Sequence, residues 1–347
     1  MTTGVVLLNF GEPEEISRDV VVPYLERIFL SNMEMEEIED EEAARERAHQ
    51  LAERRAPGLL EEYREMGPSP LKQQAREQRQ ALEQELRDRG FDVEAYDGMQ
   101  YTEPFVKDAL LQARDDGVDE LVALPVYPLC GRTTTEESLE MTSEALDELD
   151  WNPAYHEVSG WHEHPDYVEL RADNLREFVE GRGLTLGEDA ELVFSAHGTP
   201  VKYLEDGSRY RDYVEEFCEW IADRLEVDDY LLGYQNHENR DVEWTQPDTE
   251  DVVEEVDAPN VVVEPLSFMR EQSETLSELD LELREECDEA GVELHRVPIP
   301  HDDPRFAGVL ADLVEPLLTD DDLEDWGMGL CRCRETDRTY CYGPADD

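Results

Sequence analysis

Lysine is almost absent from this chain of 347 residues, which contains only Lys72, Lys107 and Lys202. With 30 lysines and arginines against 90 aspartates and glutamates, the formal net charge is −60. The acidic residues lie in segments with helical and strand patterns, so we assign them to a folded surface and not to a disordered tail. Such a surface repels itself unless salt screens it, which predicts a salt-rich cytoplasm, as in an extreme halophile. The lack of a basic face argues against nucleic acid as a partner.

Long apolar runs are also missing. No stretch approaches the roughly 20 apolar residues that a membrane-spanning helix needs, so we expect no integral membrane segment. The start, MTTGVVLLNFGEP, has no basic segment of a secretory signal, which again favours the cytoplasm. Nothing in the sequence indicates the oligomeric state.

Cysteine is scarce, with six residues in the whole chain. In a cytoplasmic protein these six are not expected to form a disulfide framework. Cys331, Cys333 and Cys341 gather near the carboxyl end, and this clustering calls for a chemical explanation. Cys218 and Cys287 lie on predicted helix faces and are expected to be buried fillers.

Short β-rich runs alternate with helical patterns along the chain. The predicted strands are Gly4–Asn9, Phe91–Tyr96, Glu120–Val126, Ala154–Val158, Glu191–Ser195, Tyr230–Gly233, Asn260–Pro265 and Glu293–Pro298. Runs such as VVLL and NVVV are continuously apolar, which is typical of strands buried on both faces of a parallel sheet. Alternation of strands and helices predicts an α/β fold with doubly wound sheets.

Two similar Rossmann-like lobes fit this length better than one large sheet. We expect a first lobe over residues 1–127 and a second over residues 128–302. A helix over residues 303–318 is expected to return to the first lobe. Residues 319–347 then form an acidic linker and a cysteine-containing tail.

The segment Phe194–Pro200 (FSAHGTP) directly follows an apolar run. It places His197 at the carboxyl end of a strand, where open α/β sheets bind ligands. Gly198 and Pro200 predict a tight turn that holds the imidazole at the mouth of a cleft. An ordinary histidine near a strand end is more often structural, and this position favours a functional role.

The segment after Asn260–Pro265 reads LSFMREQSETLSELD. A strand again ends and a helix begins, with Ser273 as the predicted N-cap. Glu274 then lies in the first helical turn, near the same cleft. An acid at that place is often only a surface group favoured by the helix dipole.

Seven segments together resemble ferrochelatases, in the family's order, from about residue 4 to residue 318. SAHGTP is similar to the family's SAHSLP motif, and PLSFMREQSETLSELD to PIGFVSDHIETLYELD. The other five are GVVLLNFGEP, MGPSPL (GGGSPL in the family), YDGMQYTEP (YVGMRYWHP), YPLCGRTTTEESL (YPQYSCSTTGSSL) and YQNHENRDVEWTQP (YQSRVGPVKWLQP).

This resemblance implies two chelatase-like lobes with a porphyrin cleft between them and the insertion of Fe²⁺ into a porphyrin in haem biosynthesis. His197 takes the role of the catalytic histidine and Glu274 that of the metal-site glutamate, facing each other across the cleft. A neutral imidazole can bind Fe²⁺ or accept a pyrrole proton, and a carboxylate can hold the cation. The segments that line the family's porphyrin cleft carry Phe10, Ser69, Tyr101, Tyr127 and Thr134.

Three departures from the family motifs affect the expected chemistry. Glu271 and Gln272 replace an Asp-His pair before the glutamate, which alters the route by which protons leave. Glu136 and Glu137 replace Gly-Ser. Gln100 replaces an arginine, which changes how a porphyrin carboxylate is recognised.

The tail resembles that of ferrochelatases that hold a [2Fe–2S] cluster. Those enzymes use a carboxyl-terminal cysteine trio and one cysteine from the loop after the first lobe. By that resemblance the ligands here are Cys130, Cys331, Cys333 and Cys341, with Arg332, Arg334 and Arg338 offsetting the charge. A zinc site or unliganded thiols are the alternatives.

Two other functions stay open at the level of the sequence. One is a cobalt or iron chelatase for a precorrin-type ring, but such enzymes present a second metal-binding histidine where this chain has Glu274. The other is a porphyrin or haem carrier without catalysis. Within the ferrochelatases, protoporphyrin IX and coproporphyrin III are both candidate substrates.

Overall fold

The computed structural model describes residues 2–36, 38, 40–237, 242–319, 322–331, 333–334 and 336–343 of the chain. Its strands are β1 (Thr3–Asn9), β2 (Val93–Met99), β3 (Glu120–Pro125), β4 (Ala154–Val158), β5 (Ala190–His197), β6 (Leu231–Gln235), β7 (Asn260–Pro265), β8 (Glu293–Arg296), β9 (Met328–Leu330) and β10 (Thr339–Tyr342).

The α-helices are α1 (Arg18–Ser31), α2 (Glu41–Met66), α3 (Leu71–Asp88), α4 (Val106–Asp115), α5 (Glu137–Glu148), α6 (Pro165–Arg182), α7 (Val201–Glu205), α8 (Tyr210–Leu225), α9 (Thr249–Glu254), α10 (Leu283–Ala290) and α11 (Pro304–Val314). Two π-helical segments precede α5 and α10, namely η2 (Arg132–Glu136) and η3 (Glu274–Glu282). Short 3-10 turns are η1 (Met33–Glu36), η4 (Glu315–Leu317) and η5 (Leu323–Trp326).

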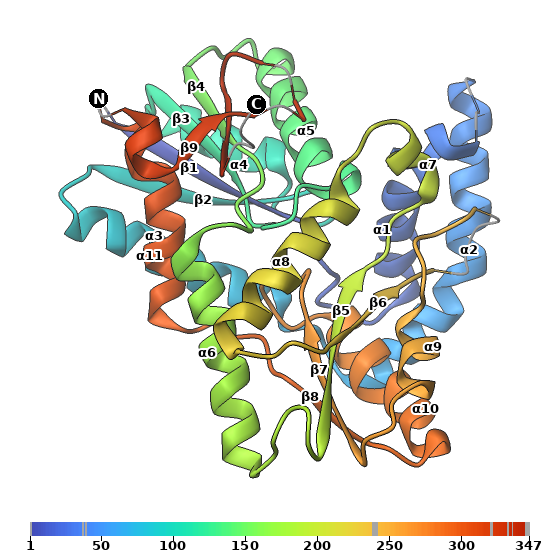
Figure 1. Ribbon diagram of the computed structural model, residues 1–347. Helices are drawn as coiled ribbons and strands as arrows, with labels where there is room; N and C mark the ends of the chain where they lie inside the picture. Colours follow the sequence, from blue (N-terminus) through green and yellow to red (C-terminus); the bar gives the residue numbers. More distant parts are fainter. Residues whose placement is uncertain are drawn as a thin grey trace.

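Two sheets form the two lobes, which lie one above the other in Figure 1. The first has the strand order β2-β1-β3-β4-β10-β9 and the second β6-β5-β7-β8. The pairings are parallel except for that of β9 with β10. All eight predicted strands are present, so the α/β prediction with parallel sheets is confirmed.

Strand β1 shows why the continuously apolar runs are central strands. Val5 and Leu7 belong to one buried cluster, and Val6 and Leu8 belong to another. The first cluster is covered by α3 and α11, and the second by α4 and α5. Because both faces are buried, each of these side chains contributes about 1.5–3 kcal/mol of burial free energy.

The predicted boundary between the lobes at residues 127 and 128 is wrong. Strand β4 was expected in the second lobe, but it pairs with β3 in the register Glu120↔Ala154 and so belongs to the first sheet. The second sheet begins with β5. Strands that follow each other along the chain are joined by a helix both within one sheet and between the two sheets. The order of elements alone therefore does not mark the boundary between the lobes.

The carboxyl-terminal tail contains strands that the sequence analysis did not predict. β9 and β10 form a hairpin, and β10 adds to the edge of β4 with Thr339 opposite Glu157. In Figure 1 this hairpin lies at the far edge of the upper sheet. The tail therefore returns to the first lobe. Helix α11, which precedes it, packs against α3 of the first lobe and α6 of the second.

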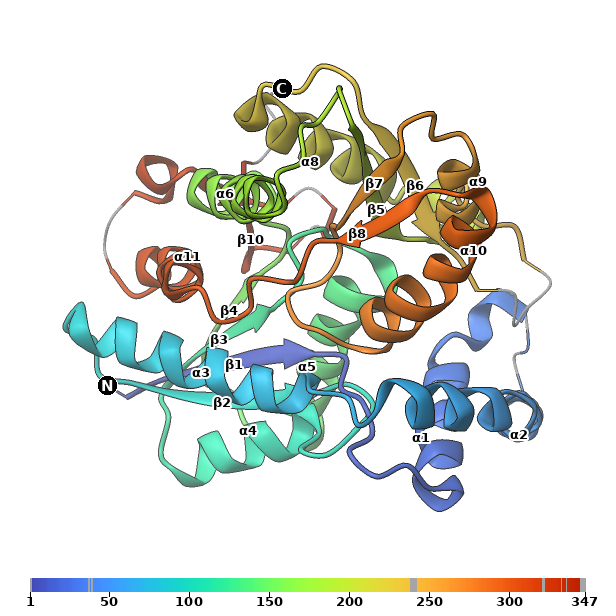
Figure 2. The same ribbon diagram turned by 90° about the horizontal axis from the view of Figure 1, so that it is seen from below.

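Helices α1 and α2 pack against each other and form a hairpin beside the sheets (Figures 1 and 2). Although the segment Met33–Arg55 is rich in acidic residues, helix α2 buries one side, including Leu51 and Ala52, in a cluster with α1. In the part of the chain described, no helix combines the length and the apolar character needed to cross a membrane.

Candidate active site

The main cavity lies between the two lobes, at the carboxyl ends of their strands. From the first lobe it is lined by Phe10, Leu71, Tyr127, Arg132, Thr133 and Thr134, and helix α1 with its C-cap Asn32 adds Ile28, Phe29 and Asn32 itself. The second lobe contributes residues that include His197, Pro200, Tyr210, His237, Phe268 and Glu274. This is where ligands bind in open α/β sheets.

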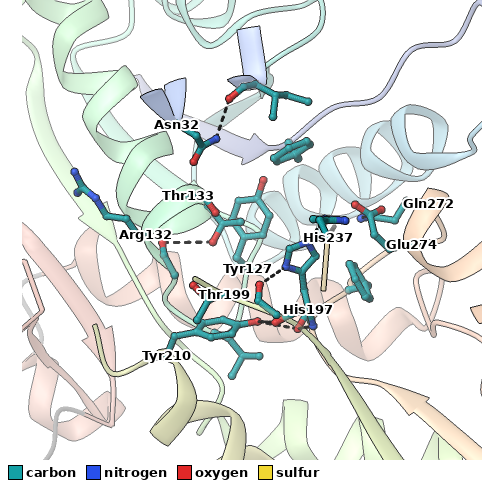
Figure 3. A pocket seen from close by; sticks show the side chains of 18 of the residues that line it. Asn32, Tyr127, Arg132, Thr133, His197, Thr199, Tyr210, His237, Gln272 and Glu274 are labelled. Carbon is teal, nitrogen blue, oxygen red and sulfur yellow. Dashed lines mark hydrogen bonds between the residues drawn. The ribbon is translucent and has the colours of Figure 1, made fainter. Parts of the chain in front are cut away.

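His197 is the last residue of β5, and its orientation is fixed by its neighbours. Its backbone N–H donates to Ser267 Oγ at 2.9 Å, and its carbonyl accepts from Tyr210 Oη at 3.0 Å. Its Nδ1 lies 2.7 Å from the carbonyl oxygen of Gly198. A carbonyl only accepts, so Nδ1 carries the proton and Nε2 of the neutral ring keeps its lone pair. Nε2 points into the cavity, as Figure 3 shows.

The residue after His197, Gly198, has no room for a side chain. A Cβ atom on Gly198 would lie 1.7 Å from Asn236 Oδ1 and 2.9 Å from the carbonyl oxygen of Gln235. The backbone of β5 therefore approaches the loop after β6 more closely than another residue type allows. This approach brings the second imidazole of the cavity, that of His237, next to His197.

His237 was not singled out by the sequence analysis. Its Nε2 lies 3.1 Å from Nε2 of His197, and its Nδ1 lies 3.9 Å from Oε1 of Glu278. Burial, the His197 imidazole and Arg55 lower the pKa of His237 to about 3, so its ring is neutral at pH 7. The only sequence signal was its place in the YQNHENR segment, two residues after the end of a strand.

Glu274 begins the π-helix η3, where an α-helix had been predicted. Its carboxylate accepts from Gln272 Nε2 at 2.7 Å and from Ser273 Oγ at 3.0 Å. Ser273 was the predicted N-cap, but its side chain makes no capping hydrogen bond. Its hydroxyl is hydrogen-bonded to the carboxyl groups of Glu12 and Glu274 instead. The sequence did not distinguish this π-helix from an α-helix, because a short segment of either kind can have the same pattern of polar and apolar residues.

A row of acids leads away from Glu274 along η3. Glu278 and Glu282 line a second, open cavity together with Glu62 and Arg55. Burial and the neighbouring Glu274 carboxylate raise the pKa of Glu278 well above its usual value. His237 lines both this acidic cavity and the main cavity. The row therefore runs from the main cavity, which Glu274 lines, to this open acidic cavity, which Glu278 and Glu282 line.

His197 and Glu274 share the main cavity, but they do not face each other from different lobes. Both belong to the second lobe, at the ends of the paired strands β5 and β7. Both residues were expected in the second lobe, and that they face each other across the cavity stays a prediction. Parallel neighbouring strands end at the same edge of a sheet, and this brings both side chains to the same cavity.

Glu12, also absent from the predicted site, lies beside Glu274. Only 3% of it is exposed. Its carboxyl group is hydrogen-bonded to the hydroxyls of Ser69 and Ser273, and accepts from Tyr63 Oη at 3.2 Å. Burial, followed by the charge of Glu274, raises the pKa of Glu12 to about 7. The signal for it was an acid three residues after the end of a buried strand.

Three of the five predicted porphyrin-contacting residues line the main cavity, namely Phe10, Tyr127 and Thr134. Ser69 and Tyr101 do not. Ser69 is bonded to Glu12, as described above. Tyr101 is 1% exposed and packs edge-on behind Phe10, with its hydroxyl donating to Glu137 at 2.9 Å.

The positions that depart from the family motifs have new partners. Gln100 accepts a hydrogen bond from Tyr127 Oη at 2.9 Å and donates to the carbonyl of Thr133 at 3.3 Å. Glu271 is paired with Arg296 at 2.7 Å and lies outside the lining of the main cavity. It therefore stands away from the row of acids formed by η3. Glu136 pairs with Arg132 at 3.2 Å.

Arg270 is a buried cation in the wall of the main cavity. It is 5% exposed, and its Nη1 donates to Asn9 Oδ1. Its Nε and Nη2 have no hydrogen-bond partner among the described residues. Burial lowers the pKa of Arg270 to about 10, against the opposing charge of Asp97, so it remains charged at pH 7. A buried charge with free donors is costly, and an anion in the cavity would offset that cost.

A separate cavity is lined by Cys130, Cys331, Cys333 and Cys341. Cys130 lies in the loop after β3, and the other three lie on the β9–β10 hairpin and its turn. Contacts run from Cys130 to Cys333, from Cys333 to Cys331 and from Cys331 to Cys341, with all four sulfurs free. Four sulfur donors around one cavity fit the ligand set of a [2Fe–2S] cluster, whereas no three of these described sulfurs all lie within 4.8 Å of one another, as the ligands of a single zinc ion would.

The arginines expected to offset the charge of that site are engaged elsewhere. Arg334 and Arg338 both bind the buried carboxylate of Glu157, at 3.0 and 3.2 Å. Arg332 lies outside the described residues. Cys218 and Cys287 are fully buried, as predicted.

Comparison with known proteins gives a consistent result. A family model described as ferrochelatase matches residues 2–318. The ferrochelatase of Picosynechococcus is 35% identical over 324 residues, which are 90% of this chain and 81% of that protein. The ferrochelatase of Synechococcus elongatus is 35% identical over 327 residues, or 91% of this chain and 82% of that protein. That of a Nostoc species is 34% identical over 323 residues, or 90% and 81%.

Two solved structures share the fold at low identity. The sirohydrochlorin chelatase SirB from Bacillus subtilis subspecies spizizenii, in complex with cobalt, aligns with a TM-score of 0.50 and 10% identity over 91% of this chain and 94% of its own. CbiX, the terminal enzyme of sirohaem biosynthesis in denitrifying bacteria, aligns with a TM-score of 0.51 and 13% identity over 91% and 100%. The chelatase-like arrangement of two lobes is therefore confirmed.

Proposed function

The chain belongs to the ferrochelatase family, and we infer from this membership that it inserts ferrous iron into a porphyrin in haem biosynthesis. The family match over residues 2–318 includes both lobes and all residues that line the main cavity. The observation that carries the inference is the meeting of His197 and Glu274 in this one cavity, at the ends of two paired strands.

His197 is proposed as the base that takes a pyrrole proton and as a ligand of the incoming iron. Two N–H protons must leave the porphyrin when Fe²⁺ enters it. The contact of Nδ1 with Gly198 leaves the lone pair on Nε2, which is the form that either task requires. Hydrogen bonds between the backbone of His197 and the side chains of Ser267 and Tyr210 fix the position of this residue, and so the position from which its imidazole extends into the cavity.

Glu274 is proposed to hold the cation and to pass protons outward. Its carboxylate stands at the inner end of the row of acids on η3, which opens into the acidic cavity. The carboxyl groups of this row can bind an entering divalent cation and can relay departing protons by the same path, because the raised pKa of Glu278 lets its carboxyl both hold and release a proton.

Arg270 is proposed to bind a carboxylate of the porphyrin. Porphyrins of haem biosynthesis carry propionate groups, and a guanidinium forms paired hydrogen bonds with a carboxylate. Its Nε and Nη2 have no hydrogen-bond partner among the described residues, but both atoms are buried, so the proposal rests on the attraction between the guanidinium charge and the carboxylate. The chain lacks the family's arginine at Gln100, and Arg270 shares the neighbourhood of that residue through Asn9 and Tyr127.

The four-cysteine cavity is proposed to hold a [2Fe–2S] cluster on Cys130, Cys331, Cys333 and Cys341. When bound, such a cluster supplies one-electron redox chemistry and a cross-link between the tail and the first lobe. Cys331 and Cys333 each contact two other cysteines, and Tyr213 Oη adds a hydrogen bond to Cys333 Sγ at 2.7 Å. These residues lie outside the main cavity, so no step of iron insertion is assigned to the cluster.

The proposed setting is a salt-rich cytoplasm. The support is the formal charge of −60 on a folded α/β chain, which molar salt would screen.

Metal insertion by the purified chain tests the function. Fe²⁺, Co²⁺ and Zn²⁺ are each offered with protoporphyrin IX and with coproporphyrin III under anaerobic conditions, and metalloporphyrin formation is followed by absorption. The expected result is catalytic formation of an iron porphyrin, and the ratio of the two turnover rates identifies the ring. Binding of both rings without insertion of any metal would instead identify a carrier.

A further inference from the structure

His197 and His237 form a pair of imidazoles inside the main cavity. Their Nε2 atoms are 3.1 Å apart, although the two residues come from different strand ends, those of β5 and β6. The ring centroids are 5.0 Å apart, with the planes at 65°. Figure 3 shows His237 between His197 and the Gln272–Glu274 pair.

Only one proton fits between the two nitrogens. Nδ1 of His197 donates to Gly198, so its Nε2 carries only a lone pair. His237 must then carry its proton on Nε2 in the metal-free protein, because two bare lone pairs at 3.1 Å would repel each other. The nitrogen that the proposed function needs as a base or ligand is therefore already covered by a second imidazole.

The separation of the two nitrogens also matches shared coordination of a metal ion. Two metal–nitrogen bonds of about 2.1 Å place their nitrogens about 3.0 Å apart at a right angle and about 3.4 Å apart at the tetrahedral angle. The observed 3.1 Å lies between these values. Imidazole suits Fe, Co, Ni and Zn ions as a ligand.

We propose that His197 and His237 bind the incoming divalent metal ion together, each through Nε2. This inference rests on the proposed function and names a second imidazole for its metal site. When the metal binds, the proton on Nε2 of His237 passes to the solvent of the acidic cavity, and Nδ1 of the same ring takes up a proton. His237 stays neutral throughout, and no proton is gained or lost overall.

The groups behind both rings suit such a pair. A metal-binding histidine usually donates its other ring N–H to a carbonyl or carboxylate. Nδ1 of His197 contacts the carbonyl of Gly198 at 2.7 Å, and the carboxyl of Glu278 lies 3.9 Å from Nδ1 of His237, just beyond direct hydrogen-bond distance. Gln235, two residues before His237, also donates to Glu278 at 2.9 Å and so holds that carboxyl near the pair.

The position of His237 suits a metal on its way to the ring. His237 lines the acidic cavity of η3 as well as the main cavity, so a cation drawn in by the acids reaches this imidazole first. The rings of Trp244 and His237 have their centroids 5.5 Å apart and their planes at 89°, and this packing limits the rotation of the His237 imidazole. The chain has Gln272 where the family motif has a histidine, so His237 supplies an imidazole from another loop.

The test uses Co²⁺ with the full chain and no porphyrin. Crystals soaked in Co²⁺ locate the ion by anomalous scattering, which separates it by position from any ion on the cysteines. Calorimetric titration compares the wild type with His237→Gln, whose amide keeps a hydrogen-bond donor to His197 but is a poor metal ligand. His295→Gln, on β8 and hydrogen-bonded to Asn260 at 3.0 Å, is the matched control.

The expected result is an anomalous peak within bonding distance of both Nε2 atoms and at least a tenfold weaker Co²⁺ site in His237→Gln. The control keeps wild-type affinity, and porphyrin affinity is unchanged in both variants. Wild-type Co²⁺ affinity in His237→Gln, or a peak bonded to His197 without His237, would overturn the shared site. His237→Asn provides a second variant should the first not fold. The proposed function is judged separately, by iron insertion in His197→Ala, and survives if only the shared site fails.

Discussion

Glu12 of the first lobe and Glu274 of the second lobe are hydrogen-bonded to one and the same hydroxyl, that of Ser273. The contact joins the loop after β1 to the start of the π-helix, where the proposed metal-site carboxylate lies. Two carboxylates this close do not ionise independently, and the more buried one, Glu12, is the one whose pKa is raised. Glu12 is therefore a positioning residue for Glu274 whose effect depends on pH.

The first prediction concerns stability against pH. The pKa of Glu12 is about 7 in the folded protein and near 4.5 in the unfolded chain, so the folded state binds more protons between these values. The contribution of this group to the free energy of unfolding is therefore fully present below pH 4.5 and is lost as pH rises through 7. The loss amounts to about 3 kcal/mol. Glu12→Gln should remove this loss. Urea unfolding at pH 5 and pH 8 measures it, with exposed Glu15→Gln as the control. An equal pH dependence in wild type and Glu12→Gln would show that Glu12 ionises normally.

The second prediction concerns Arg270. Arg270→Gln should weaken binding of the free porphyrin acid about tenfold, because one charge-assisted pair is lost. Binding of the corresponding porphyrin methyl ester, which has no carboxylate, should not change. Fluorescence quenching measures both affinities, and Arg114→Gln at the surface is the control. If the acid and the ester lose affinity equally, Arg270 supports the cavity wall and does not bind a propionate.

The third prediction concerns the tail. Anaerobically purified protein should show the visible absorption of a [2Fe–2S] cluster, with two iron atoms and two sulfides per chain. Cys333→Ser should lose both, and Cys287→Ala, at a buried position outside the site, should keep them. Colourless, iron-free protein with full activity would contradict the cluster, and bound zinc in its place would support the tetrahedral alternative.

The fourth prediction concerns salt. With a formal charge of −60, low ionic strength leaves the surface repulsion unscreened, because the Debye length falls from about 10 Å at 0.1 M to about 3 Å at 1 M salt. The midpoint of thermal unfolding should therefore rise steeply from about 0.1 M to several molar KCl. A flat or falling midpoint over this range would refute the salt-rich setting.

Much of the fold and part of the site could be predicted from the sequence. Short β-rich runs identified the eight parallel strands, and several of these runs are continuously apolar because burial on both faces leaves no polar alternation. The same strand ends identified His197 and Glu274. The tail hairpin could not be predicted, because β9 and β10 are short and acquire their order by pairing with β4. The predicted lobe boundary was wrong because nothing in the local sequence indicates that β4 pairs with β3.

The missed site residues share a different cause. Glu12, His237 and Arg270 are polar residues in loops, and in so acidic a chain one more glutamate carries little information. Their importance comes from burial and from partners distant in sequence, such as Ser273 for Glu12. Conversely, Ser69 and Tyr101 were placed in the cavity by resemblance, and packing puts them behind it. Tertiary contacts decide which loop side chains face the substrate.

The central claim is that His197 supplies the nitrogen on which iron insertion depends. The most direct measurement is the rate of iron porphyrin formation by His197→Ala, beside its porphyrin affinity, with His295→Ala as the control. The account predicts at least a hundredfold loss of turnover, with porphyrin affinity close to that of the wild type because the cavity walls hold the ring. Turnover near that of the wild type in His197→Ala would contradict the account.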